Sequence, residues 1–173
     1  GNNPLTWNTE SALYMHQMFQ NCSDFNQRLK DASGGPNWDV SQLGTDTGLP
    51  AGYALEQMFK GCTVFNNGDS GNNDNNPLEW NVSNVKKFWQ MFYDCYVFNQ
   101  ELIFTTSSAI SFNHMFGNAF EFNQDLSGWD TSKVTDFRYM FKGCAAFNNG
   151  DPGNNGNNPL TWNTESALYM HQM

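Results

Sequence analysis

Two segments rich in asparagine and glycine carry the acidic side chains best suited to metal chemistry. They read FNNGDSGNNDNNPL (65–78) and FNNGDPGNNGNNPL (147–160). Asp69, Asp74 and Asp151, with the neighbouring asparagine oxygens, predict a Ca²⁺ site, because Ca²⁺ prefers oxygen ligands. The alternative is a purely structural loop, since no D-x-D-x-D-G pattern occurs and Asn and Gly favour turns. No other cofactor is expected.

Cysteine chemistry is the second possibility. Cys22, Cys62, Cys95 and Cys144 occupy one position of a repeated pattern, and Ala119 holds it in the remaining copy. Adjacent coils of a repeat stack lie about 4.8 Å apart, a separation compatible with a ladder disulfide between Cys62 and Cys95. A buried ladder of free thiols is the alternative, which we favour because parallel side chains have poor disulfide geometry.

The remaining candidate residues indicate modification or surface roles rather than catalysis. Asn21 and Asn81 begin N-x-S sequons and are candidate N-glycosylation sites. His16, His114 and His171 lack recurring acidic or cysteine partners, so they are expected to be surface residues. No nucleophile elbow, phosphate-binding loop or HExxH sequence is present. The sequence therefore does not predict an enzyme.

Composition narrows the class further. The net charge is −9 with only eight Lys and Arg residues, which argues against a nucleic-acid partner because phosphate binding needs a basic face. No apolar run approaches the length of about 18 residues that a membrane span requires. Aromatic residues make up 16% of the chain, and their regular spacing predicts a packed core rather than disorder.

A short repeat of about 25 residues organises these positions, and a period of this length is typical of a stacked array. Each copy contains a Met, usually followed by Phe, with a Phe-Asn pair seven and eight residues after the Met. In most copies an aromatic residue lies eleven positions before the Met and completes the predicted core. That core comprises Trp7, Trp80, Trp129, Met18, Met58, Met91, Met115, Met140 and the Phe of each Phe-Asn pair.

The spacing within a copy predicts its local structure. Val134, Phe137, Met140, Phe141 and Cys144 fall on one face of a short helix, and Phe-Asn-Gln-x-Leu alternates as a short strand does. The sequence thus predicts an α/β fold: a leucine-rich-repeat-like solenoid of about five coils, each a strand plus a helix, with a parallel stacked sheet.

Two further expectations follow from the repeat positions. The Asn after each Phe predicts an asparagine ladder, in which a side-chain amide bonds the backbone of its own and the next coil. A positive-φ turn residue is the alternative, since Asn tolerates that conformation. Trp89 shares its repeat position with His16, Glu56 and Arg138, so it is expected to face outward.

A longer period contains the short one. Residues 1–18 and 156–173 are identical, an offset of 155 residues. We therefore expect residues 1–173 to be a single solenoid cut from a longer array, with short repeats at 5–31, 36–66, 78–103, 104–127, 128–149 and 160–173. Both ends should expose apolar repeat positions, covered by further copies through covalent continuation or end-to-end stacking.

The string WDTSKVTDFRYMFKGCAAFNN (129–149), preceded by FNQDLSG, resembles the bacterial surface-protein 26-residue repeat family, which is related to BspA-like leucine-rich-repeat surface proteins. The resemblance implies a leucine-rich-repeat-like solenoid, an extracellular or cell-surface location and a role associated with adhesion. It brings no catalytic residues. The chain departs from that pattern at Ala119 and in the asparagine- and glycine-rich insertions.

The function expected from these features is structural: an extracellular rod, fibre or surface-layer scaffold. The alternative is a surface adhesin or ligand-binding solenoid for a glycan, calcium, ice or a partner protein. The expected partners are further copies of the chain, with a glycan or a cell surface as a second class.

Overall fold

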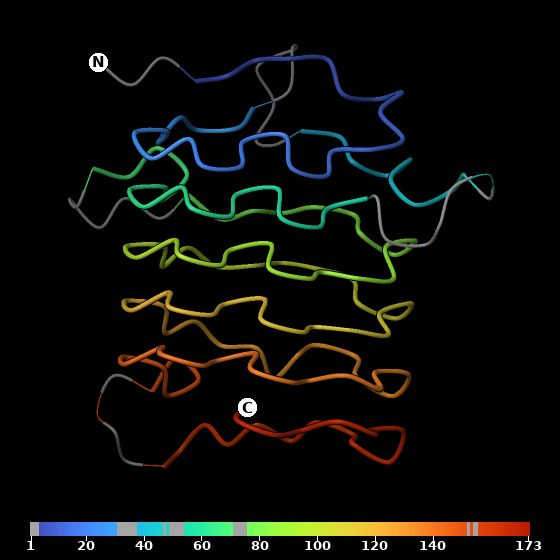
Figure 1. Ribbon diagram of the computed structural model, residues 1–173, viewed down its shortest axis with the longest axis vertical. Helices are drawn as coiled ribbons and strands as arrows, with labels where there is room; N and C mark the ends of the chain where they lie inside the picture. The colour runs from blue at the N-terminus through green and yellow to red at the C-terminus, as the bar shows by residue number, and fades with distance from the viewer. Residues whose placement is uncertain are drawn as a thin grey trace.

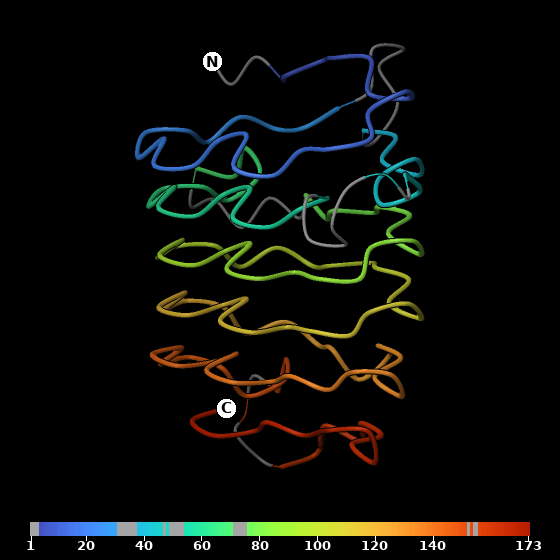
Figure 2. The same ribbon diagram turned by 45° about the vertical axis from the view of Figure 1, so that its right-hand side comes forward.

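The chain folds into coils that lie in layers along one axis, with its two ends at opposite ends of the stack (Figure 1). A second view shows the same layering, each coil being a flattened loop beside the next (Figure 2). The structure is a computed structural model, and it describes residues 4–30, 38–46, 48, 54–70, 76–151, 153 and 156–173. Statements about the fold refer to these residues.

The predicted strand-plus-helix solenoid of the leucine-rich-repeat type is wrong. Across the described ranges the backbone forms no helix and no continuous strand, only turns and isolated parallel bridges. One column of bridges joins Lys87, Ser111, Asp136 and Tyr169. The other bridges pair Leu5 with Leu29 and Leu78 with Leu102, where the sequence predicted strands.

Backbone hydrogen bonding explains why no helix forms around the repeated Met. Alternate N–H groups donate to the next coil, for example Gln90 to the carbonyl of Asn113 at 3.1 Å and Phe92 to that of Met115 at 2.9 Å. The N–H groups between them close tight turns, as Met91 does onto Phe88 at 3.2 Å. In an α-helix, each of these N–H groups would instead donate to the carbonyl four residues back in its own coil.

Positive φ angles fix this run of turns. The residue before each repeated Met has φ between 51° and 57°, and the third residue after it is Asn, Asp or Gly, also at positive φ. The first of these positions holds Gln17, Gln57 and Gln90. Their amides form a ladder, with Gln17 Nε2 donating to Gln57 Oε1 at 2.6 Å and Gln57 Nε2 to Gln90 Oε1 at 2.7 Å. A left-handed residue interrupts any right-handed helix.

The core consists of aromatic columns that run along the stack. Phe59, Phe92, Phe116 and Phe141 stack at centroid separations of 5.5–5.8 Å. A second column follows the Phe of each Phe-Asn pair, with Phe98 lying 5.7 Å from Phe65 and 5.9 Å from Phe122. The two columns contact each other within a coil at about 4 Å, so each ring is enclosed on several sides.

The predicted core is confirmed in the interior coils, where Phe65, Phe98 and Phe122 are also buried. It differs toward both ends, where Phe25 and Phe147 are only partly buried. Met58, Met91, Met115, Met140, Trp80 and Trp129 are all buried. Trp7 and Met18 are exposed, at 46% and 39%, because no coil among the described residues covers the N-terminal face of the stack. Trp89 is 43% exposed, which confirms its predicted outward position.

The predicted asparagine ladder is confirmed. Asn26, Asn66, Asn99 and Asn123 each accept, through Oδ1, a hydrogen bond from the backbone N–H of the corresponding Asn in the next coil, at 2.7–2.9 Å. These four residues are absent from the set of positive-φ residues, so the alternative turn role falls to other asparagines such as Asn67 and Asn149.

No helix long and apolar enough to cross a membrane occurs among the described residues.

Candidate binding groove

A groove of about 650 Å³ runs along the side of the stack, and we call it the lateral groove. Most of its lining comes from residues two and four positions before a repeated Met, and the residues four before belong to the column of parallel bridges. The remaining lining residues lie one position before a Met (Gln17, Gln57) or five before (Ile110, Thr135). Because these positions recur in each coil, the groove crosses several coils. It is lined by His16, Gln17, Glu56, Gln57, Lys87, Trp89, Ile110, Ser111, Asn113, Thr135, Asp136 and Tyr169.

Glu56 is the most unusual side chain of the lateral groove. It is 6% exposed, and its Oε2 atom is buried without a hydrogen-bond partner. Burial raises the pKa of Glu56 to about 7, and its own backbone and the charge of Lys87 offset that rise only in part. A buried polar atom left without a partner is uncommon in folded proteins and marks a place where a ligand or water can bind.

Lys87 faces Glu56 from the next coil without forming a contact ion pair, since Arg138 with Asp136 is the one ion pair within the described residues. A cation and a carboxyl group thus line the same groove separately. The Lys87 ammonium group can donate hydrogen bonds to a ligand. The Glu56 carboxyl group can accept a hydrogen bond and, when protonated, can also donate one.

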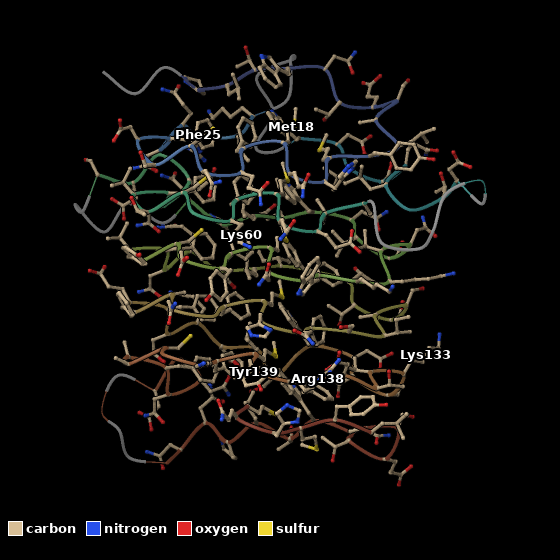
Figure 3. The ribbon with its side chains drawn as sticks, in the orientation of Figure 1. Met18, Phe25, Lys60, Lys133, Arg138 and Tyr139 are labelled. Carbon is tan, nitrogen blue, oxygen red and sulfur yellow. The ribbon has the colours of Figure 1, made fainter. Side chains whose placement is uncertain are left out.

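Asp136 lines the groove and is held by Arg138, which lies beside the groove lining. Arg138 donates from Nε and from its terminal nitrogen to Asp136, both at 2.8 Å, and Asn113 Nδ2 donates to Asp136 at 2.9 Å. Although burial alone would raise it, these hydrogen bonds lower the pKa of Asp136 to about 2. The Arg138 guanidinium also lies 4.7 Å from the ring centre of Tyr169. Figure 3 shows Arg138 toward the C-terminal end of the stack and Lys133 apart from it at the lateral edge.

Aromatic surface completes the groove. Trp89 and Tyr169 are 43% and 48% exposed, and both line it. Large aromatic side chains that stay exposed beside polar groups are typical of binding surfaces. The lateral groove therefore combines two aromatic faces, an unpaired cation and a carboxyl group with a free oxygen.

The predicted calcium residues lie elsewhere. Asp69 and Asp151 occupy equivalent positions in two loops, and Asp74 lies outside the described residues. Asp69 Oδ2 accepts from the amide of Asn66 at 3.2 Å, while Asp151 accepts from the N–H groups of Gly153 and Asn157 at 3.0 and 3.2 Å. In the part of the chain that is described, no three His, Cys, Asp or Glu side chains are grouped as metal ligands. A calcium site stays a prediction.

Asn67 and Asn149 hold these two loops in the same way. Each Oδ1 accepts a backbone N–H from the preceding coil, from Leu29 at 2.9 Å and from Leu126 at 2.8 Å. Each side-chain amide then donates across the loop, to the carbonyls of Asn76 and Asn158, both at 2.8 Å. This network gives both loops a structural role, whatever else they bind.

The cysteines are free thiols in the structure, Cys62 and Cys95 included. Cys62 Sγ donates to the carbonyl of Phe19 at 2.9 Å, Cys95 Sγ to that of Phe59 at 3.0 Å, and Cys144 Sγ to that of Phe116 at 2.8 Å. Each thiol thus bonds the preceding coil. Burial raises the pKa of Cys62 to about 12 and that of Cys95 well above its usual range.

The sequon asparagines are both exposed. Asn21 has a φ of 62° and donates its N–H to the carbonyl of Lys60 at 2.7 Å, while Asn81 Oδ1 accepts from the N–H of Ser83 at 3.2 Å. His114 is not a fully exposed surface residue: it packs 4.5 Å from Tyr139, and its pKa is lowered by burial and by the charges of Lys142 and Arg138.

The sequence predicted that Trp89 faces outward, but it did not predict that Glu56, Lys87, Asp136 and Tyr169 line the same groove. The available signal was the repeat register, because residues two and four before each Met share one side of the stack. What no register reveals is that Glu56, unlike Trp89 in the same column, is buried.

Stacked coils with a common set of core positions define the chain as a tandem-repeat protein. It belongs to the family described as Mycoplasma protein of unknown function, DUF285, which matches residues 2–76 and 53–173. The predicted membership of the BspA-like 26-residue repeat family is therefore wrong. No curated protein and no solved structure matches the chain.

Proposed function

We propose that the chain is a structural repeat protein whose stack is lengthened by further coils of its own sequence, as a rod, fibre or surface-layer scaffold. One comparison carries the proposal. Met15 and Met170 are the same residue in the same eighteen-residue sequence, yet Met15 is 4% exposed and Met170 is 43% exposed.

The two environments differ in which face of the coil is covered. Near the N-terminus, Met15 and Gln17 donate their N–H groups to the carbonyls of Ala54 and Glu56 in the next coil, at 2.9 and 3.0 Å. At the other end of the stack, the carbonyls of Tyr169 and His171 accept from Phe137 and Tyr139 in the preceding coil, at 2.8 and 3.2 Å.

Since residues 14–17 and 169–172 are identical, one coil sequence makes backbone bonds on both of its faces. In the first coil, the face that contains Met15 is covered by the next coil. The equivalent face of the last coil is open, and the apolar residues Leu168, Met170 and Met173 are exposed there. A coil like that at 54–61 is complementary to this face. A second copy of the chain, or a covalent continuation, supplies such coils.

The experiment is sedimentation velocity of the chain over a hundredfold range of concentration, with negative-stain imaging of any assemblies. We expect concentration-dependent association into rods, suppressed by Met170→Glu on the open face. Phe120→Glu is the matched control, because Phe120 is 45% exposed on the side of the stack. A monomer at all concentrations, or association that Met170→Glu leaves unchanged, overturns the proposal.

The extracellular or cell-surface location, the absence of an enzymatic activity and the calcium ligand stay predictions.

A further inference from the structure

The lateral groove has features that end-to-end stacking does not use. It lies along the side of the stack, while the faces proposed to bind further coils belong to the first and last coils, which lie at opposite ends of the stack (Figure 1). Its lining keeps one buried carboxyl oxygen, Glu56 Oε2, without a partner, and leaves the indole of Trp89 open to solvent. These are the properties of a surface that binds something other than another coil.

The charges of the groove select among ligand classes. The chain carries a net charge of −9, which disfavours an anionic polymer. Lys87 is close enough to Glu56 to lower the pKa of its carboxyl group, so the same positive charge repels a cationic ligand from that carboxyl. A neutral ligand avoids both penalties.

Hydroxyl groups meet the hydrogen-bonding needs of this lining. A hydroxyl donates one hydrogen bond and accepts others, so adjacent hydroxyls of one molecule can donate to Glu56 Oε2 and accept from the Lys87 ammonium. The C–H face of a sugar ring is apolar and flat, and it packs on an exposed aromatic ring such as that of Trp89. Since the lining positions recur from coil to coil, the groove suits several linked rings rather than one.

We propose that the lateral groove binds a neutral oligosaccharide along the stack axis, with one ring packed on Trp89 and neighbouring hydroxyls bonded to Glu56 and Lys87. Asp136 is already bonded to Arg138 and Asn113, so it shapes the far end of the groove. This binding site is independent of the proposed end-to-end assembly.

The test uses the whole chain and three neutral hexasaccharides of different linkage: cellohexaose, chitohexaose and maltohexaose. Binding is measured by isothermal titration calorimetry, with tryptophan fluorescence as a second readout. We expect at least one of them to bind with a dissociation constant below about 1 mM, and Trp89→Ala and Lys87→Met each to weaken that binding at least tenfold.

Matched controls are Phe120→Ala, an exposed aromatic residue outside the groove, and Lys133→Met, an exposed lysine at the lateral edge (Figure 3). Both should bind as the unsubstituted chain does, and the thermal unfolding of all four variants shows whether each is folded. Absence of binding by all three hexasaccharides overturns the proposal. So does binding that the controls weaken as much as the groove variants, or preferential binding of oligolysine or heparin at this groove.

Discussion

Asn99 Oδ1 accepts the backbone N–H of Asn123 from the next coil at 2.9 Å, and it also accepts the side-chain amide of Gln124 at 2.8 Å. The same asparagine oxygen joins neighbouring coils at Asn26, Asn66 and Asn123. The bond does locally what a sheet ladder does elsewhere: it gives a turn N–H a partner where no continuous strand supplies one. Side-chain ladders of this kind therefore help to hold together a stack that lacks regular secondary structure.

Removing one asparagine of the ladder should destabilise the stack measurably. Asn99→Ala leaves the Asn123 N–H without its partner, and we expect a loss of about 1–2 kcal/mol in the free energy of unfolding by urea. Asn99→Asp keeps an acceptor oxygen and should lose less. Equal losses for the two variants would show that the oxygen is not what matters.

The aromatic column should be far less tolerant. Phe98 is fully buried between Phe65 and Phe122, so Phe98→Ala is expected to cost about 3–5 kcal/mol in unfolding free energy. Trp89→Ala should cost little, because Trp89 is 43% exposed. A reversal of this order in denaturant melts would contradict the assignment of the core.

A glycine at the left-handed turn position and a glycine elsewhere provide a sharper pair of variants. Gly143 has a φ of 79°, and a Cβ there would lie 2.5 Å from Asn118 Oδ1. Gly143→Ala is therefore expected to cost about 1–2 kcal/mol. Gly128 has no atom within 4 Å of an added Cβ, and Gly128→Ala should change stability by less than about 0.5 kcal/mol. Similar thermal shifts for both variants would argue against the left-handed turns.

The sequence predicted which side chains face inward, but not the backbone that places them there. Val134, Phe137 and Met140 have helical spacing, yet the same spacing arises from turns with a left-handed residue before each Met. The two differ in where the N–H groups go: Phe137 donates to Tyr169 of the next coil rather than back along its own coil. That choice depends on the neighbouring coil, which no single repeat reveals.

A local signal of the turns was nevertheless present. The third residue after the repeated Met is Asn21, Gly61, Asp94, Asn118 or Gly143, all types that tolerate a positive φ. The groove was less accessible to sequence reasoning. The outward position of Trp89 followed from the register, whereas the burial of Glu56 depends on how adjacent coils pack.

Glu56 should make stability depend on pH in an unusual direction. Burial raises the pKa of Glu56 from its ordinary value of about 4.5 to about 7, so between these pH values the folded state binds more protons than the unfolded state. The stability that the protonated carboxyl group contributes is therefore lost as pH rises from about 4.5 to about 7. We expect this loss in the free energy of unfolding to be about 1–3 kcal/mol. His114 contributes in the opposite direction, since its pKa is lowered.

The difference between the unsubstituted chain and Glu56→Gln isolates this effect, because both retain His114. Urea unfolding at pH 5 and pH 8 should show the unsubstituted chain losing stability relative to the variant as pH rises. A difference that stays constant across this range would mean that Glu56 titrates normally.

The thiol ladder predicts that cysteine reactivity depends strongly on position. Cys22 is exposed, whereas Cys62 and Cys95 are buried and donate to carbonyls of the preceding coil. With its pKa raised to about 12, Cys62 at pH 8 is ionised to about one part in ten thousand, and the thiolate is the reactive form. In the folded chain, a disulfide reagent such as dithionitrobenzoate should therefore modify Cys22 rapidly and leave Cys62 and Cys95 unmodified until the chain unfolds.

Cys22→Ser should abolish the rapid phase, and mass spectrometry under oxidising conditions should find no bond between Cys62 and Cys95. Rapid modification of either buried thiol, or a disulfide that joins them in the folded chain, would refute the ladder of free thiols.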